Sequence, residues 1–191
     1  MNDIIQKLNP NKTASIRELG KVDITELKQL ISKLGDQLWE IETNGRENGF
    51  AVFHHTQHVI FRFPHTSITR LDVHDNPSWA IWKPFLLPIM EASVKPYGYK
   101  NGQFKAVMLA KLKAGHGIDK HRDGLPEYYY LHKIHIPIQT NSKVHFHIEP
   151  QDYFLKEGFA YEVNNLLPHY VANKSKQDRI HLIFEYINEY S

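Results

Sequence analysis

Apolar residues recur at helical spacing in one stretch near the start of the chain. Their intervals of three and four residues predict one apolar face of an α-helix. The recurring residues are Ile24, Leu27, Leu30, Ile31 and Leu34. Asp23 followed by Glu26 fits an N-terminal capping arrangement, and Gly35 favours an end of the helix. Pro84 favours the start of a second helix that runs to about Val94.

From residue 104 onward the pattern becomes that of β-strands. Residues 104–112 are mostly apolar, and three later segments alternate apolar with polar side chains, which predicts strands with one buried face. The alternating segments are 133–139, 144–149 and 179–186. Shorter aromatic and β-branched runs at 39–42, 50–54 and 59–63 predict three more strands. Several short strands separated by turns indicate a mainly β fold, either a sandwich or a barrel.

Composition narrows the class of protein. The chain has 191 residues, of which 41% are hydrophobic, so it can form one domain with a sizeable core. It has no cysteine, which excludes disulfide scaffolds, thiol catalysis and cysteine-type zinc sites. The 23 basic and 21 acidic side chains nearly balance, which argues against a nucleic-acid partner. Because no apolar run is long enough for a membrane span or a signal peptide, we expect a cytoplasmic protein.

The chain has 13 histidines, and two of them suggest a metal site. His121 and Asp123 are two residues apart, so on an extended segment their side chains face the same side. His169 follows Asp123 by 46 residues. Two imidazoles and one carboxylate that leave open coordination positions form the facial triad of non-haem Fe(II) oxygenases. Arg179 lies ten residues after His169, and its guanidinium is suited to bind the distal carboxylate of 2-oxoglutarate.

Two other interpretations remain open at this point. His145 and His147 share one face of a predicted strand and, with His121, would form a cupin-type metal site that does not use 2-oxoglutarate. A cupin places a glutamate several residues further on, whereas Glu149 follows His147 by two. The other alternative is a non-catalytic interaction module on the same fold, although a scaffold has no need for a complete ligand set.

Residues 107–186 resemble the aspartyl/asparaginyl β-hydroxylase family of 2-oxoglutarate oxygenases. The matching segments are 112–123, 133–138, 157–165, 168–173 and 179–184. The N-terminal half is similar more loosely, through residues 19–24 and the positions of Leu27, Trp39, Arg46 and His55 with Thr56. The resemblance therefore covers most of the chain, and its specific part contains the candidate metal ligands.

The resemblance implies a double-stranded β-helix of the jelly-roll or cupin-like type, with supporting N-terminal helices. We accordingly expect one domain over residues 1–191, with an N-terminal arm at 1–20, a support region at 21–100 and a metal-binding core at 101–191. The family also implies an enzyme that uses Fe(II), 2-oxoglutarate and O2. Its reaction would hydroxylate a C–H bond of an amino acid or a peptidyl side chain and release succinate and CO2.

The resemblance further implies roles for single residues. His121, Asp123 and His169 would bind Fe(II), and Arg179 would bind the distal carboxylate of 2-oxoglutarate. The family often has Arg-x-His on the strand after the first ligand, where this chain has Lys133-Ile134-His135. We therefore expect these two side chains to bind 2-oxoglutarate as well, the lysine keeping the charge without the planar fork of arginine.

Five more side chains are candidates for lining the substrate side of the site. They are His116, Arg122, His145, His147 and His181. A wall of cationic and titratable groups favours a ligand of opposite charge. We therefore expect a small-molecule or peptide substrate that bears a carboxylate.

Overall fold

The computed structural model describes residues 12, 14–33, 36, 39, 51–65, 72–124 and 129–188. The strands are β1 Ile16–Lys21, β2 Thr56–Pro64, β3 Val73–Asp75, β4 Gly102–Leu112, β5 Gly117–His121, β6 His132–Gln139, β7 Val144–Ile148, β8 Gln151–Tyr153, β9 Phe159–Val163, β10 His169–Asn173 and β11 Arg179–Asn188. The α-helices are α2 Thr25–Lys33 and α4 Pro77–Val94, and two short 3-10 helices are η1 Ala51–Phe53 and η2 Lys95–Tyr97. The expected mainly β class is confirmed.

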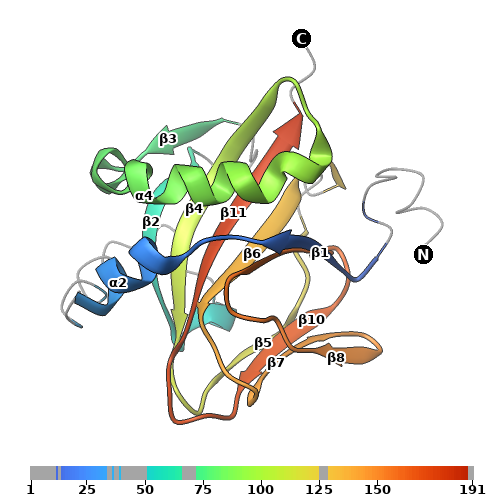
Figure 1. Cartoon of the computed structure of the whole chain (residues 1–191). Helices are drawn as coiled ribbons and strands as arrows, with labels where there is room; N and C mark the ends of the chain where they lie inside the picture. The colour runs from blue at the N-terminus through green and yellow to red at the C-terminus, as the bar shows by residue number, and fades with distance from the viewer. Residues whose placement is uncertain are drawn as a thin grey trace.

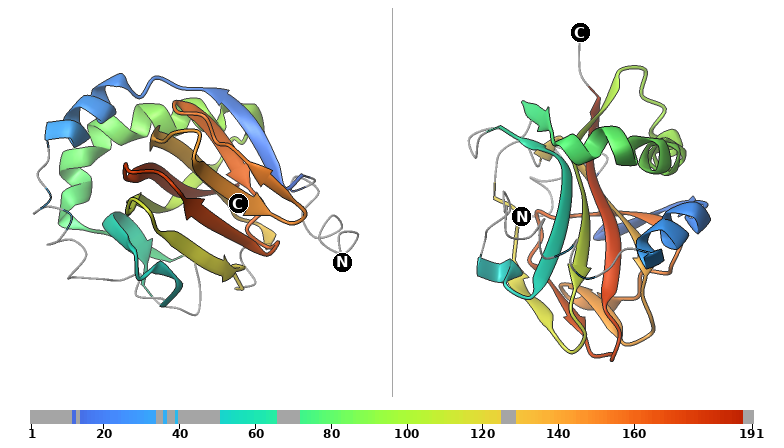
Figure 2. Two further views of the ribbon diagram at one scale, coloured as in Figure 1. Left: turned by 90° about the horizontal axis from the view of Figure 1, so that it is seen from below. Right: turned by 90° about the vertical axis from the view of Figure 1, so that its left-hand side faces the viewer.

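The strands form two antiparallel sheets. The larger sheet has the order β1-β9-β6-β11-β4-β2-β3, and the smaller sheet has the order β5-β10-β7-β8. Neighbouring strands are often distant in sequence, as where β11 lies between β6 and β4. Figure 2 shows the smaller sheet on one side of the larger sheet and the two helices on the other. This is the two-sheet arrangement of a double-stranded β-helix.

Alternation along the central strands separates two environments. On β11, Ile180 and Leu182 join the core under the helices, whereas Ile183 and Glu185 line a cavity on the opposite face of the larger sheet. The helix side is closed by large apolar residues of α4, of which Trp82 packs against Phe61. Both helices lie along this face in Figure 1. The helices therefore stabilise the larger sheet from outside and leave its inner face to line the cavity.

The helix ends differ partly from the sequence-based expectation. The first helix begins at Thr25, whose backbone N–H donates to the Asp23 carboxylate at 3.0 Å, as the capping pattern predicts. The second helix begins at Pro77 and not at Pro84. Pro84 and Pro88 lie inside α4 on its exposed side, where water can satisfy the carbonyls that the prolines leave unpaired.

Three early segments also need correction. Residues 16–20, expected in a loose arm, belong to β1, which pairs with β9 about 140 residues later, a contact that local pattern does not reveal. Most of the expected strand at 50–54 is the 3-10 helix η1, and the next strand starts at Thr56. Of the expected strand at 39–42, only Trp39 is described, and it is helical. Gly35 lies outside the described residues.

The strands expected from residue 104 onward are confirmed as β4, β6, β7 and β11, with ends shifted by at most two residues. The strand expected at 59–63 is confirmed within β2. No helix among the described residues is long and apolar enough to cross a membrane.

Candidate functional site

A cavity of about 820 Å³ lies on the inner face of the larger sheet. Its walls are mostly apolar and include Met108, Phe146 and Val171. The polar residues in the lining are His58, His65, His74, His121, Arg122, Asp123, Lys133, His135, His169, Arg179 and Glu185, with Thr56. A mostly apolar pocket with a few convergent polar groups is the usual form of a small-molecule site.

Three potential metal ligands converge in this cavity. His121 ends β5, His169 begins β10, and the two residues are direct partners in the antiparallel pairing of these strands. Asp123 follows His121 by two residues, and its backbone N–H donates to the Asn165 carbonyl at 3.0 Å. One ligand atom from each of the three side chains lies within 4.8 Å of the others. The strand pairing therefore brings the later histidine to the earlier pair.

Backbone carbonyls orient both imidazoles in the same way. His121 Nδ1 lies 2.7 Å from the Asp119 carbonyl, and His169 Nδ1 lies 2.8 Å from the Leu167 carbonyl. A carbonyl only accepts, so Nδ1 carries the proton and Nε2 keeps its lone pair for a metal. Burial lowers the pKa of His169 to about 4, which keeps this imidazole neutral near pH 7.

The Asp123 carboxylate is held in its ionised form. Burial acts to raise its pKa, but the Lys133 ammonium and two hydrogen bonds outweigh burial and hold the pKa well below the usual range. Lys133 Nζ donates to Asp123 Oδ2 at 2.7 Å, and Asn165 Nδ2 donates to the same oxygen at 2.8 Å. No described residue donates to Oδ1. Two imidazoles whose Nδ1 atoms bind carbonyls, and one ionised carboxylate with an oxygen that no described residue binds, suit a divalent metal such as Fe(II).

Arg179 forms the other polar end of the cavity. Its side chain is 1% exposed, and among the described residues no carboxylate forms an ion pair with it. One terminal N–H donates to His181 Nδ1 at 2.7 Å, while Nε–H has no described partner. Burial lowers the pKa of Arg179 to about 9, yet at pH 7 the group stays charged. A buried guanidinium with an unpaired N–H fits a ligand carboxylate.

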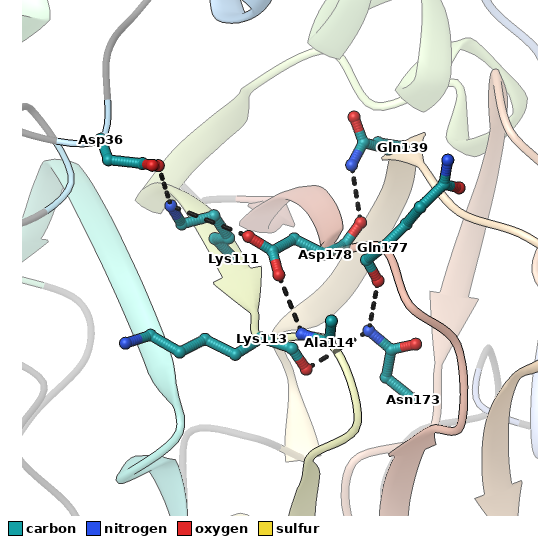
Figure 3. A network of polar contacts seen from close by, with 8 residues as sticks. All are labelled: Asp36, Lys111, Lys113, Ala114, Gln139, Asn173, Gln177 and Asp178. Carbon is teal, nitrogen blue, oxygen red and sulfur yellow. Dashed lines mark hydrogen bonds and ion pairs between the residues drawn. The ribbon is translucent and has the colours of Figure 1, made fainter.

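A polar network holds the turn that precedes Arg179 (Figure 3). Asp178 Oδ1 accepts the Ala114 N–H at 2.8 Å, and the Asp178 carbonyl accepts from Gln139 Nε2 at 2.7 Å. Lys111, which is 5% exposed, lies 3.9 Å from Asp178 Oδ2 and 3.1 Å from Asp36 Oδ1. These contacts join the start of β11 to β4 and β6, so Arg179 enters the cavity from a fixed backbone.

The remaining candidates divide between the cavity and other surroundings. Lys133, His135 and Arg122 line the cavity, the first two from β6. His181 is buried behind Arg179 and lies 3.5 Å from His135, Nδ1 to Nδ1. Burial, with the Arg179 charge second, lowers the pKa of both His135 and His181 well below the usual value.

Three further candidate histidines, like His181, do not reach the cavity lining. His145 and His147 alternate with the cavity residue Phe146 on β7, so they face the other side of the smaller sheet. His147 Nδ1 lies 2.6 Å from Asp152 Oδ1 and its ring stacks on Tyr170. His116 is exposed, with its ring 3.9 Å from that of His55. The structure thus does not bring His145 or His147 together with His121, as the cupin-type alternative would require.

Two residues of this site carry no signal in the sequence alone. Asn165 binds the Asp123 carboxylate from the turn after β9, and Lys12 in turn donates to Asn165 Oδ1 at 2.7 Å. An asparagine in a turn is ordinary, and a lysine near the chain start predicts exposure. Only the three-dimensional arrangement shows that both are buried beside a candidate ligand.

Comparison with known proteins gives a consistent result. The sequence model of the Aspartyl/Asparaginyl beta-hydroxylase family matches residues 84–189. No curated protein matches the chain. Among solved structures, an oxidoreductase of the 2OG-Fe(II) oxygenase family from Burkholderia pseudomallei has a TM-score of 0.63 at 11% identity, over 99% of this chain and 91% of that chain.

Two further solved structures share this arrangement. A Pseudomonas putida prolyl-4-hydroxylase has a TM-score of 0.52 at 10% identity and covers 100% of both chains. The protein EvdMO1 has a TM-score of 0.57 at 17% identity, over 92% of this chain and 48% of that chain. At such identities these similarities show the fold, which is the double-stranded β-helix expected from the sequence.

Proposed function

Because this chain belongs to the aspartyl/asparaginyl β-hydroxylase family, and is thus an oxygenase-type enzyme, we propose that it is an Fe(II)- and 2-oxoglutarate-dependent hydroxylase. Its reaction would hydroxylate a C–H bond of an amino acid or peptidyl side chain and release succinate and CO2. The observation that carries this proposal is one cavity that contains both a His-Asp-His cluster and a buried arginine without a described carboxylate partner.

The residues at the two ends of the cavity would bind different groups. His121, Asp123 and His169 would hold Fe(II), and Arg179 would bind the distal carboxylate of 2-oxoglutarate through paired N–H donors. Fe(II) and 2-oxoglutarate, when bound, would supply the oxidation by O2 that no side chain of the protein can perform. His135, which lines the cavity from the middle of β6 and stays neutral, can donate or accept a hydrogen bond there.

Lys133 would act at the metal end. Its ammonium already donates to Asp123 Oδ2, which keeps that carboxylate ionised and leaves Oδ1 for the metal. An ammonium has three N–H donors, so Lys133 can also bind an incoming carboxylate without releasing Asp123. The apolar walls, including Met108 and Phe146, would exclude water and strengthen these electrostatic contacts.

We propose a carboxylate-bearing substrate, either a small molecule or a peptide. This proposal is supported by Arg122, an exposed cation in the cavity lining that lies between His121 and Asp123 in the sequence. His116, His145, His147 and His181, which were also expected to line the substrate side, lie outside the lining and do not contribute to this argument. The electrostatic preference therefore depends on fewer groups than the sequence indicates.

Succinate formation tests the proposal. The purified protein is incubated with Fe(II), 2-oxoglutarate and O2, with and without a panel of free amino acids, Asp- or Asn-containing peptides and amines that lack a carboxylate. We expect metal- and 2-oxoglutarate-dependent succinate release that rises with a carboxylate-bearing compound. Turnover confined to the carboxylate-free amines would contradict the substrate class alone. Absence of succinate in every arm, with the protein folded and metal bound, would contradict the proposed reaction.

A further inference from the structure

Lys12 is a buried cation beside the candidate metal ligands, although it comes from the first residues of the chain. Its side chain is 3% exposed, and its Nζ donates to Asn165 Oδ1 at 2.7 Å across 153 positions of sequence. The carboxylates whose charges act on it are Glu162, Asp123 and Glu185. A lysine buried among carboxylates is far from the solvated position usual for this residue.

Asn165 connects Lys12 to the ligand carboxylate. The Asn165 side chain is fully buried, and its Nδ2 donates to Asp123 Oδ2 at 2.8 Å. The backbone carbonyl of Asn165 accepts the Asp123 backbone N–H at 3.0 Å. The same turn supplies the Leu167 carbonyl that orients the His169 ring. The turn at residues 164–167 therefore supports two of the three candidate ligands.

The direction of the Asn165 amide follows from the chemistry of its two neighbours. An ammonium only donates, so Asn165 must present its oxygen to Lys12 and its NH2 to Asp123. Without the Lys12 donor, the buried Asn165 oxygen loses its hydrogen bond, so the side chain can turn toward another donor. Such a turn would move the NH2 away from Asp123 and remove one of the two donors on Oδ2.

We propose that Lys12 is a positioning residue of the metal site, which acts by fixing the amide of Asn165 so that Asp123 presents Oδ1 to the metal. This inference rests on the proposed function, because it assigns metal binding to Asp123. Lys12 thus becomes part of the site, although it lies far from the ligands in the sequence. Groups that support a metal ligand through hydrogen bonds typically change metal affinity 10- to 100-fold, roughly, when removed.

Mn(II) affinity of the full-length protein, measured by calorimetry without 2-oxoglutarate, tests this role. We expect Lys12→Met to weaken Mn(II) binding about 10-fold. Lys12→Gln keeps an N–H donor without the charge, so it should restore affinity to within about threefold of the wild type. The Gln variant also keeps the test decisive if Lys12→Met does not fold, because a folded Gln variant that loses about 10-fold would overturn the proposal.

A double-mutant cycle separates positioning from general stabilisation. In an Asn165→Ala background, Lys12→Met should change Mn(II) affinity by less than about twofold, because the group through which Lys12 acts is gone. Lys111→Met is the matched control: Lys111 is 5% exposed and ion-paired with Asp36, so its loss should lower thermal stability but leave Mn(II) affinity unchanged.

The outcomes are distinguishable. Equal affinity of wild type and Lys12→Met, or an undiminished effect of Lys12→Met in the Asn165→Ala background, would overturn the role of Lys12 and leave the metal site intact. A wild-type protein that binds no Mn(II) would instead overturn the metal site itself, and the role of Lys12 with it.

Discussion

The two polar ends of the cavity differ in how completely the protein itself satisfies them. At the triad, both imidazoles bind backbone carbonyls, and Asp123 accepts hydrogen bonds from Lys133 and Asn165. At the other end, Arg179 is more deeply buried than Asp123, but it has no described carboxylate partner and its Nε–H has no described acceptor. One end is charge-balanced before any ligand arrives, whereas the other end lacks an anion.

This difference indicates what each end requires. The triad needs only a cation to exploit groups that are already oriented, so its geometry should form without ligand. Burying an uncompensated guanidinium opposes folding, because desolvation favours its neutral form and lowers its pKa. Such a group is retained where a ligand supplies the missing charge. We therefore expect the bound ligand to stabilise the protein at Arg179, whereas Arg179 without a ligand contributes little or nothing to the free energy of unfolding.

The largest effect should come from removing the anionic member of the triad. We expect Asp123→Ala to lower Mn(II) affinity more than about 1,000-fold, beyond the 10- to 100-fold typical of supporting groups. Without the Asp123 carboxylate, the positive charges of Lys133 and Lys12 would also oppose binding of the metal cation. Calorimetry measures this change, and Asp152→Ala is a matched control, since Asp152 binds His147 outside the cavity lining. Similar affinities of Asp123→Ala and wild type would exclude Asp123 as a ligand.

The next effect concerns the arginine end. We expect Arg179→Met to weaken 2-oxoglutarate binding to the Mn(II)-loaded protein by about 30- to 1,000-fold, equivalent to roughly 2–4 kcal/mol, because a charge-assisted contact is lost. Mn(II) affinity should not change. Lys133→Met should weaken 2-oxoglutarate binding less, because an ammonium lacks the planar fork.

Stability gives an independent check on Arg179. Without ligand, Arg179→Met should unfold at a temperature equal to or above that of the wild type, since it removes a buried charge that the protein leaves unpaired. With Mn(II) and 2-oxoglutarate, the wild type should gain thermal stability and the variant should gain little. A ligand-free variant that is much less stable than the wild type would indicate that the protein itself already compensates the arginine.

The smallest effect is a pH dependence that originates behind Arg179. Burial, reinforced by the Arg179 and His135 charges, lowers the pKa of His181 well below its usual value. Below about pH 6.5 the unfolded chain binds a proton at this position and the folded protein does not. The free energy of unfolding therefore decreases as the pH decreases, by at most about 1.4 kcal/mol per pH unit. His181→Gln keeps an acceptor for Arg179 and should remove the part of the pH dependence of stability that His181 causes. Urea unfolding between pH 5 and pH 8 measures it, and identical slopes would refute the assignment.

Local features of the molecule were predictable from the sequence. The spacing of His121 and Asp123 places both side chains on one side of an extended segment, and alternation along residues 133–139 separates the inward Lys133 and His135 from the outward Ile134. These inferences need only the geometry of a single strand. The start of α2 was likewise predictable, since the Asp23 cap is contained within a few residues.

Features that depend on long-range contacts were not predictable in this way. The pairing of β1 with β9 gives no periodic pattern, because an edge strand with half-exposed residues resembles a loop. The outward direction of His145 and His147 depends on Phe146 facing the cavity, which strand alternation alone leaves ambiguous. Lys12 and Asn165 meet across 153 positions, and no local rule relates them.

The central claim is that one ligand bridges the two ends of the cavity, and glutarate tests it most directly. Glutarate has the same two carboxylates as 2-oxoglutarate but lacks the ketone, so it can bind Arg179 without chelating the metal. Calorimetry of both compounds, with and without Mn(II), separates the two contributions. The account predicts that Mn(II) tightens 2-oxoglutarate binding at least about 10-fold, because the two ligands would contact each other and so raise each other's affinity. Mn(II) should change glutarate binding far less, because glutarate lacks the ketone. Mn(II) that leaves 2-oxoglutarate affinity unchanged would contradict a shared site.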